Sequence, residues 1–274
     1  MRKRIKALSL FSNVGIAETY LNEIGIDVVI ANEINETRAK FYSHLYPEVN
    51  MIVGDITDKK IKEMIIVEGK EKNVDLIMAT PPCQGMSTAG KHDKNDERNM
   101  LIKYAVEIVK KIKPKFAFFE NVPEQLTTNI NYRGKNILIP DYIKSELDEL
   151  YNFNNSHIIN AADYGVPQMR ERAIFLLVRK DQNIIWKFPA KKEKPITLLE
   201  AIGSLPSLDP ELYDLTHEEQ MKIFPDYEKK KLEGLKISKW HYPPKHIYRQ
   251  VFSLMHTPSG ETAFNNIDKF KPKK

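Results

Sequence analysis

The sequence predicts an α/β protein built around a mostly parallel sheet. From residue 5 to about residue 180, short apolar runs alternate with segments of helical periodicity. The apolar runs are nearly continuous, which is typical of parallel strands that are buried on both faces. Polar and reactive residues follow several of these runs directly, and ligands bind at that edge of such sheets.

Seven apolar runs are predicted to be strands: Ile5–Leu10, Val28–Ala31, Met51–Val53, Val74–Ala79, Phe116–Phe119, Ser156–Asn160 and Ala173–Val178. Helical patterns lie between them and are expected to cover both faces of the sheet. The clearest is Met100–Lys113, whose apolar positions recur at helical spacing and whose polar face is rich in lysine. After Arg179 the pattern gives way to scattered prolines and one short predicted helix, Thr197–Ile202. We therefore expect one domain over residues 1–190 and an irregular segment over 191–274.

Composition narrows the class of protein. The chain has 274 residues, of which 42% are apolar and 29% charged, as expected of a soluble globular protein. It contains no apolar run of about 18 residues, the length needed to cross a membrane. The single cysteine, Cys83, rules out an intrachain disulfide and predicts a reducing, cytoplasmic location. The basic and briefly apolar start is interpreted as the lead into the first strand and not as a signal peptide.

Positive charge is concentrated near the end of the sequence. Residues 225–274 contain eleven Lys and Arg against five Asp and Glu, whereas the whole chain carries a net charge of +5. This asymmetry favours a polyanionic partner such as nucleic acid close to the last fifty residues. A solvated lysine-rich tail explains the same pattern equally well.

Three predicted strand ends outline a pocket for a nucleoside. The first strand runs into FSNVG (11–15), a turn of small residues that is expected to open a helix and where backbone N–H groups can meet a ligand. Glu33 follows the second strand at the spacing at which a carboxylate binds ribose hydroxyls, and Asp55 follows the third strand. No phosphate-loop lysine is present, which argues against a nucleoside triphosphate. An ordinary turn and a helix-capping carboxylate remain alternatives for the first two positions.

The fourth predicted strand ends in TPPCQGMS (80–87), which holds Cys83. Two prolines stiffen this loop and prevent the strand from continuing, so the thiol is expected at the ligand-binding edge. A thiolate there is a strong nucleophile. Glu120 ends the fifth strand, where partial desolvation should raise its pKa and suit it to share a proton. A nucleophilic cysteine beside an acid suits addition to an electron-poor ring, although a lone cysteine is more often a buried structural residue.

The last informative stretch is QMRER (168–172), just before the apolar run at 173–178. Strand alternation would place Gln168, Arg170 and Arg172 on one face. Two arginines on one face can brace carboxylates or phosphates. A solvated strand start is the alternative.

These motifs together resemble the cytosine-5 DNA methyltransferase family. TPPCQGMS resembles its Pro-Cys-Gln loop, FENV (119–122) its Glu-Asn-Val and QMRER its Gln-x-Arg-x-Arg, all in family order, with NEIN (32–35) and GDIT (54–57) before them. The resemblance covers residues 7–190 and implies a Rossmann-like, S-adenosylmethionine-dependent methyltransferase sheet. It also implies transfer of a methyl group to C5 of a cytosine flipped out of double-stranded DNA, in a restriction–modification setting.

The resemblance assigns roles to individual residues. Cys83 would add to C6 of the cytosine, Glu120 would bind N3 and the exocyclic amine, and Arg172 would hold the base, supported by Arg170 and Gln168. The S-adenosylmethionine pocket would be formed by Phe11, Gly15, Glu33, Ile34, Asp55, Ile56, Pro82 and Leu101. No metal is expected.

The sequence also departs from the family pattern. Ser9 stands where Asp is common, Asn13 where Gly is common, and Ile34 at a position that is often aromatic. No Arg-Glu-containing motif and no C-terminal Gly-Asn segment follow residue 190, so residues 191–274 are interpreted as the start of an incomplete target-recognition region. We therefore expect a second polypeptide that carries the missing parts, as in family members split into two chains. Cytosine-5 methylation of tRNA, and a catalytically idle remnant that binds nucleic acid, are the alternatives.

Overall fold

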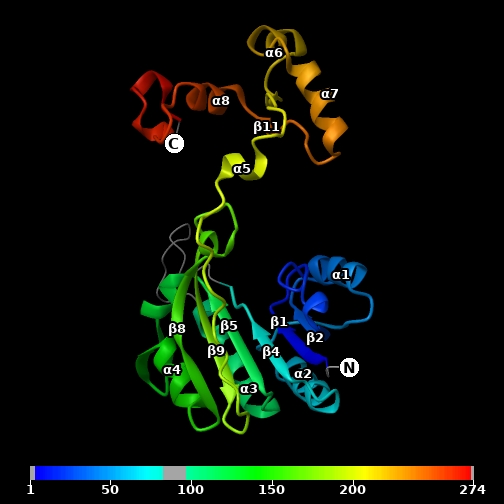
Figure 1. Cartoon of the computed structure of the whole chain (residues 1–274), viewed down its shortest axis with the longest axis vertical. Helices are drawn as coiled ribbons and strands as arrows, with labels where there is room; N and C mark the ends of the chain where they lie inside the picture. The colour runs from blue at the N-terminus through cyan, green and yellow to red at the C-terminus, as the bar shows by residue number, and fades with distance from the viewer. Residues whose placement is uncertain (1–3, 83–96, 273–274) are drawn as a thin grey trace. The chain divides into compact units, whose positions relative to one another are not determined.

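The computed structural model describes residues 4–82 and 97–272. The chain forms two compact units, Met1–Pro195 and Ile196–Lys274 (Figure 1). The first unit contains the large sheet and all the predicted site residues that the structure describes. The second consists of short helices and two very short strands.

The first unit is built on a seven-stranded sheet in the order β3-β2-β1-β4-β5-β9-β8. Its strands are β1 (Ile5–Leu10), β2 (Ile26–Glu33), β3 (Asn50–Val53), β4 (Leu76–Ala79), β5 (Phe116–Asn121), β8 (Tyr151–Asn160) and β9 (Glu171–Arg179). β9 is antiparallel to both of its neighbours, and the other pairs are parallel. All seven predicted strands are present, and the α/β prediction is confirmed.

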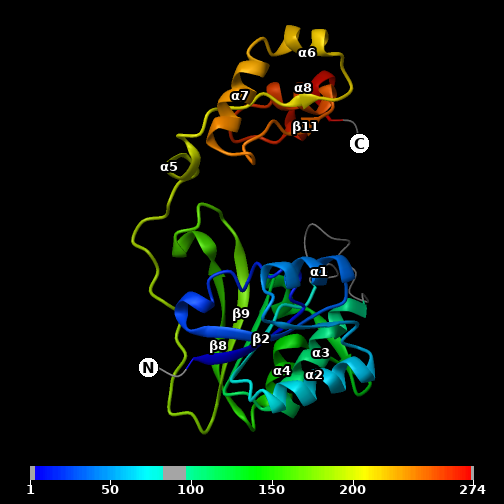
Figure 2. The same ribbon diagram turned by 90° about the vertical axis from the view of Figure 1, so that its right-hand side faces the viewer.

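Three helices pack together over one face of the sheet: α2 (Lys59–Glu71), α3 (Leu101–Ile112) and α4 (Ile139–Leu147), as Figure 2 shows. The apolar stripe predicted for α3 is the buried one, with Ile102, Val106 and Val109 fully enclosed. These helices pack against alternate strand residues such as Leu8 and Ile77, because successive side chains of a strand point to opposite faces.

The other face of the sheet carries Ala7, Leu76 and Met78, the neighbours of those residues along the strands. Leu21, between β1 and β2, and Trp186, after β9, pack against this face. α1 (Glu36–Leu45) follows β2 and joins it to β3.

The order of the strands determines where a ligand can bind. β1 pairs with β2 on one side and with β4 on the other, so the connections leave β1 in opposite directions. Such a reversal opens a crevice at the carboxyl ends of the strands. FSNVG, Asp55 and the start of the TPPCQGMS loop follow strands at this edge, and Glu33 is the last residue of β2.

Two local features differ from the sequence expectations or were not foreseen. FSNVG leads into turns and a single 3-10 turn, Asn22–Ile24, instead of an α-helix. A hairpin of β6 (Asn129–Tyr132) and β7 (Lys135–Leu138) was not foreseen. Its two loop residues, Arg133 and Gly134, both have positive φ, the geometry of a tight hairpin turn.

The second unit contains α5 (Leu198–Ile202), β10 (Glu211–Leu212), α6 (His217–Ile223), α7 (Tyr227–Ile237), β11 (Lys245–His246) and α8 (Tyr248–Met255). α5 and α6 each begin with a threonine capping box, at Thr197 and Thr216. The His256 and Phe270 rings stack with centroids 3.9 Å apart and close the end of α8. Within the described part of the chain, every helix is too short or too polar to span a bilayer.

Candidate active site

A cavity of about 640 Å³ lies at the carboxyl ends of β1, β2, β3 and β4. Its lining includes seven of the eight residues predicted to bind the cofactor: Phe11, Glu33, Ile34, Asp55, Ile56, Pro82 and Leu101. Gly15 is the eighth and does not line it. The sequence reasoning missed the polar lining residues Asn13, Asn32, Arg38, Thr57, Thr80 and Arg98.

The turn after β1 takes a conformation that is rare for residues other than glycine. Phe11 and Asn13 both have positive φ, 60° and 52°. Asparagine tolerates this left-handed region better than most residues, so Asn13 can take a conformation that usually requires glycine. The turn is held in place because Ser12 donates its backbone N–H, at 3.0 Å, and its hydroxyl, at 3.2 Å, to the Asn32 carbonyl.

Gly15 does not line the cavity but packs against two tyrosines next to the turn that does. Its φ is +83°, and a Cβ atom added there would lie 2.3 Å from Cε2 of Tyr46 and 3.0 Å from the ring of Tyr42. The Tyr46 hydroxyl donates to the Gly15 carbonyl at 2.7 Å. The aromatic side chains around α1 therefore pack directly against the turn, and only glycine fits at this position.

Glu33 links two backbone segments. One carboxylate oxygen accepts the Asn13 N–H at 3.0 Å, and the other accepts the Asn35 N–H at 2.9 Å. Asn35 in turn caps the start of α1 by accepting the Arg38 N–H. Each carboxylate oxygen has a second acceptor position, so these bonds are compatible with further bonds to ligand hydroxyls.

Asn32 organises the opposite wall. Its buried side-chain amide donates to the Ile52 carbonyl at 2.9 Å and to the Gly54 carbonyl at 3.1 Å. These bonds join the end of β2 to β3 and to Gly54, the residue before Asp55. The position of Asn32 directly before the predicted ribose-binding Glu33 was a weak signal for this role, because an asparagine after an apolar run is common.

Glu120 lies within β5 and forms an ion pair with Arg172 of β9. Arg172 Nε is 2.8 Å from Glu120 Oε1, and the side chains of Arg172 and Glu120 are 20% and 25% exposed, respectively. Burial raises the pKa of Glu120, while the positive charges of Arg172 and Arg170 oppose that rise. The site thus holds a largely desolvated carboxyl group whose proton affinity is tuned by two guanidinium groups.

Gln168 and Arg170 precede β9, which begins at Glu171. The alternation of side chains along a strand therefore does not place them on one face with Arg172, as the sequence predicted. The Gln168 N–H bonds to the Val166 carbonyl at 2.7 Å, a tight turn that delays the strand until residue 171. Asn160 Oδ1 accepts the Arg170 N–H at 3.2 Å. Gln168 and Arg170 are both exposed.

Cys83 lies outside the described residues. Pro81 and Pro82, which precede it, are described, and the Pro81 carbonyl accepts a 3.0 Å hydrogen bond from the Asn121 side chain. Asn121 follows Glu120 in β5, and the sequence analysis gave it no role.

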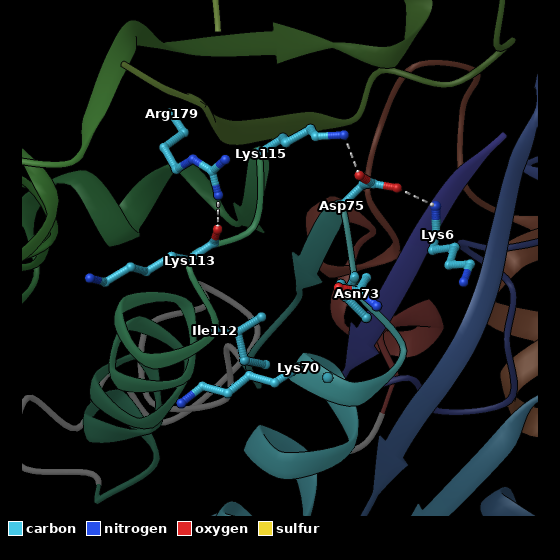
Figure 3. Close-up of a pocket in the computed structure, with 10 residues that line it drawn as sticks. Lys6, Lys70, Asn73, Asp75, Ile112, Lys113, Lys115 and Arg179 are labelled. Carbon is cyan, nitrogen blue, oxygen red and sulfur yellow. Dashed lines mark hydrogen bonds and ion pairs between the residues drawn. The ribbon is translucent and has the colours of Figure 1, made fainter. Parts of the chain in front are cut away.

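A second cavity, of about 360 Å³, lies at the opposite end of the sheet, and five of its ten lining residues are Lys or Arg (Figure 3). Lys6, Lys115 and Arg179 make contacts within the fold. Lys115 pairs with Asp75 at 2.7 Å, the Lys6 side chain donates to the Lys72 carbonyl at 3.1 Å, and Arg179 donates to the Lys113 carbonyl. Because Lys72 and Lys113 cap the ends of α2 and α3, these cations stabilise helix C-termini. Among the described residues, no group of three His, Cys, Asp or Glu side chains is arranged to hold a metal ion.

The known proteins to which this chain is similar are methyltransferases. Type II methyltransferase M1.HgaI of Avibacterium volantium is 38% identical over 272 residues, which is 97% of this chain and 69% of that protein. Type II methyltransferase M.AquIA of Picosynechococcus is 28% identical over 232 residues, which is 75% of this chain and 90% of that protein. A structure described as a prophage-encoded DNA modification methyltransferase of E. coli superposes with a TM-score of 0.60 and 26% identity. The superposition covers 77% of this chain and 58% of that one.

The chain spans about half the length of several other curated Type II methyltransferases that it matches. The family model for C-5 cytosine-specific DNA methylases matches residues 5–272, almost the whole sequence. The chain belongs to the C-5 cytosine-specific DNA methylase family, the DNA (cytosine-5) methyltransferases.

Proposed function

We propose that this chain transfers a methyl group from S-adenosylmethionine to C5 of a cytosine in double-stranded DNA, as the modification enzyme of a restriction–modification system. The observation that carries the proposal is the Glu120–Arg172 ion pair, which lies one strand away from the nucleoside-sized cavity. Thr80 and Pro82 line that cavity, and Asn121 connects Pro81 to the strand of Glu120. Cofactor and target base would therefore meet at the carboxyl ends of β4 and β5.

The cavity fits S-adenosylmethionine in size and chemistry. Its volume is in the range usual for small-molecule sites. Glu33 keeps acceptor positions for ribose hydroxyls, Asp55 can accept the adenine amine, and Phe11, Ile56 and Leu101 offer apolar walls. When bound, the cofactor supplies an activated methyl group for a carbon nucleophile.

The protein groups would act on the cytosine ring as follows. The Cys83 thiolate adds to C6, and the electron pair moves toward N3, where protonated Glu120 donates a hydrogen bond or the proton. C5 becomes nucleophilic and takes the methyl group as the bond between that methyl group and the cofactor sulfur breaks. Loss of the C5 proton to a solvent base and cleavage of the C6–S bond then release 5-methylcytosine and the thiolate, and a proton given to N3 returns to the Glu120 carboxylate. Arg172 would orient the Glu120 carboxyl, with Arg170 and Gln168 in support.

Access to C6 and C5 requires the cytosine to leave the stacked duplex. The last fifty residues carry the excess of positive charge, so the second unit is proposed to contact DNA and to begin the target-recognition region.

A second polypeptide belongs to the same proposal. An apolar groove of about 290 Å³ lies on the sheet face opposite α2–α4 and is lined by Ile5, Ile26, Leu76, Phe116, Ile184, Ile185 and Trp186. It is a surface of the kind that a partner segment covers, because sheets of this class usually have both faces covered. The near-complete coverage of M.AquIA supports the existence of family members about as long as this chain.

The first test is transfer of tritiated methyl groups from S-adenosylmethionine into unmodified DNA and into tRNA. The chain is assayed alone and together with the product of the adjacent reading frame, and Cys83→Ser defines zero. We expect incorporation into DNA that requires Cys83. Incorporation into tRNA alone would replace the DNA substrate with tRNA, and no incorporation in any mixture would overturn the proposed activity. Full activity of the chain alone would remove the partner from the proposal.

A further inference from the structure

A buried hydrogen bond between two side chains closes the turn that follows β1. The hydroxyl of Ser9, the second-last residue of β1, donates to Glu18 Oε1 at 2.5 Å. Both residues are 4% exposed. The residues between them, 10–17, include the whole of FSNVG. The Ser9–Glu18 bond therefore connects the two ends of this turn.

The turn enclosed by this bond has a backbone conformation that needs support from its surroundings. Phe11, Asn13 and Gly15 all have positive φ, of 60°, 52° and 83°. The left-handed region is unfavourable for residues other than glycine, because Cβ comes too close to the following carbonyl oxygen. Release of the ends of the turn would let Phe11 and Asn13 return to more favourable φ values.

Ser9 is also the side chain that supports the Glu18 carboxyl group. Glu18 Oε2 is buried and has no hydrogen-bond partner among the residues that the structure describes. Without the Ser9 hydroxyl, neither oxygen would accept a hydrogen bond from a described side chain. A buried polar group that loses its partner retains the cost of its desolvation. Loss of either member of the pair should therefore release the turn.

The turn forms one wall of the cavity at the carboxyl ends of β1–β4. Phe11 and Asn13 line this cavity, and the Asn13 N–H donates to Glu33, the proposed ribose-binding residue, at 3.0 Å. Ser9 and Glu18 do not line it. The pair can thus influence a ligand in the cavity through the conformation of the turn, without contact with the ligand.

We infer that Ser9 and Glu18 are positioning residues for S-adenosylmethionine: their buried hydrogen bond holds the turn after β1 in the conformation that binds the cofactor. The inference rests on the proposed function, which assigns the cofactor to this cavity. A site that is in its binding conformation for only a fraction of the time has its apparent affinity reduced by that fraction. The effect is therefore on cofactor affinity and not on the rate of methyl transfer at saturating cofactor.

The test measures the dissociation constant of S-adenosylmethionine by isothermal titration of the full chain, with the partner present if binding requires it. Ser9→Ala removes the donor, and Glu18→Met removes the acceptor with little change in length. Ser9→Thr keeps a donor and Glu18→Gln keeps an acceptor. Ser145→Ala is the matched control, because it removes a hydroxyl that donates to the Tyr142 carbonyl of α4 at 2.9 Å.

We expect the dissociation constant to rise about tenfold in Ser9→Ala and in Glu18→Met. The double variant should lose no more affinity than either single variant, because both changes remove the same bond. Ser9→Thr, Glu18→Gln and Ser145→Ala should bind within about twofold of the wild type. At saturating cofactor, kcat should stay within about twofold of the wild type in every variant that denaturant unfolding shows to be folded.

Titration of the wild-type protein separates this inference from the proposed function. If the wild type does not bind S-adenosylmethionine, the proposed function fails and the inference fails with it. If the wild type binds and folded Ser9→Ala binds equally well, only the positioning role is wrong. The role is also wrong if Glu18→Gln loses as much affinity as Glu18→Met, or if the two single losses add in the double variant. Should Glu18→Met not fold, equal affinities of Ser9→Ala and Ser9→Thr would overturn the role.

Discussion

Arg172 of β9 reaches across the sheet to Glu120 of β5, with Nε 2.8 Å from Oε1. Glu120 is paired with Ile174 in the antiparallel ladder, so Arg172 is its diagonal neighbour on the same face. The chain reversal between β8 and β9 thus brings a cation from the end of the domain to the catalytic carboxyl of the proposed reaction.

Arg172→Gln should shift the pH dependence of methyl transfer as well as lower its rate. Arg172 lowers the pKa of Glu120 against the larger effect of burial, so its removal lets that pKa rise further. We expect the limb of the kcat profile that belongs to Glu120 to move to higher pH and kcat to fall by about 10²-fold. Arg4→Gln, which removes an exposed ion pair with Asp27, is the control and should leave the profile in place. An unshifted limb in folded Arg172→Gln would contradict the coupling.

Gly15→Ala should weaken binding of S-adenosylmethionine, whereas Gly25→Ala should not. Both glycines have nearly the same positive φ, +83° and +85°, so both variants incur backbone strain of about 1 kcal/mol. A Cβ atom at Gly15 meets Tyr46 and Tyr42, but one at Gly25 has no atom within 4 Å. Isothermal titration with S-adenosylmethionine is expected to give at least a tenfold loss for Gly15→Ala alone. Equal losses in the two variants would mean that strain, and not packing against the tyrosines, controls the turn.

Glu33→Gln should reduce both cofactor affinity and stability. An amide has only one acceptor oxygen, so it cannot accept the Asn13 and Asn35 N–H groups on its two side-chain heteroatoms. Hydrogen bonds to a charged acceptor contribute about 1.5–3 kcal/mol each. The expected loss in S-adenosylmethionine affinity is therefore tenfold or more, measured by titration. Glu36→Gln, at an exposed position three residues later, provides the comparison and should bind as the wild type does.

Glu18→Gln should flatten the pH dependence of stability. Glu18 is buried, accepts the Ser9 hydroxyl at 2.5 Å, and has its pKa raised by burial above the ordinary 4.5. A raised pKa means that the folded state binds the proton more tightly than the unfolded state. This stabilisation is complete below pH 4.5 and is lost as the pH rises through the folded pKa, with a slope of at most about 1.4 kcal/mol per pH unit.

Denaturant unfolding of the wild type and Glu18→Gln from pH 4 to pH 8 measures this slope. Gln cannot ionise and can still accept the Ser9 hydroxyl, so the unfolding free energies of the two proteins should diverge in favour of Gln as the pH rises. Parallel curves would show that Glu18 does not titrate in this window.

Most strands could be predicted from the sequence because each is a short apolar run with a turn or polar residue after it. β1 has the predicted bounds, and the other six overlap their predicted ranges. The β6–β7 hairpin was not predicted, because its strands are short and mostly polar and because Arg133-Gly134 is a weak turn signal. The FSNVG turn was expected to open a helix. Its residues Ser12 and Gly15 instead form hydrogen bonds with Asn32 and Tyr46.

The reactive residues of the site could be predicted from the sequence, but the hydrogen bonds that support them could not. Acidic residues after strands, the proline-flanked cysteine and the arginine pair marked the reactive positions by type and order. Asn32 and Asn121 gave no comparable signal, since an asparagine after an apolar run is common in turns of every kind. Their roles depend on carbonyl groups that are 20 and 40 residues away in the sequence.

The sequence by itself therefore determined the α/β class, the positions of the strands, and which edge of the sheet carries the reactive residues. These are local properties, because periodicity and residue type act over a few neighbouring positions. Only the tertiary structure decided that Tyr46 closes over Gly15, that Glu33 joins two backbone segments, and that Arg172 meets Glu120. Each of these contacts depends on the order in which the strands assemble, which brings together groups that no local pattern connects.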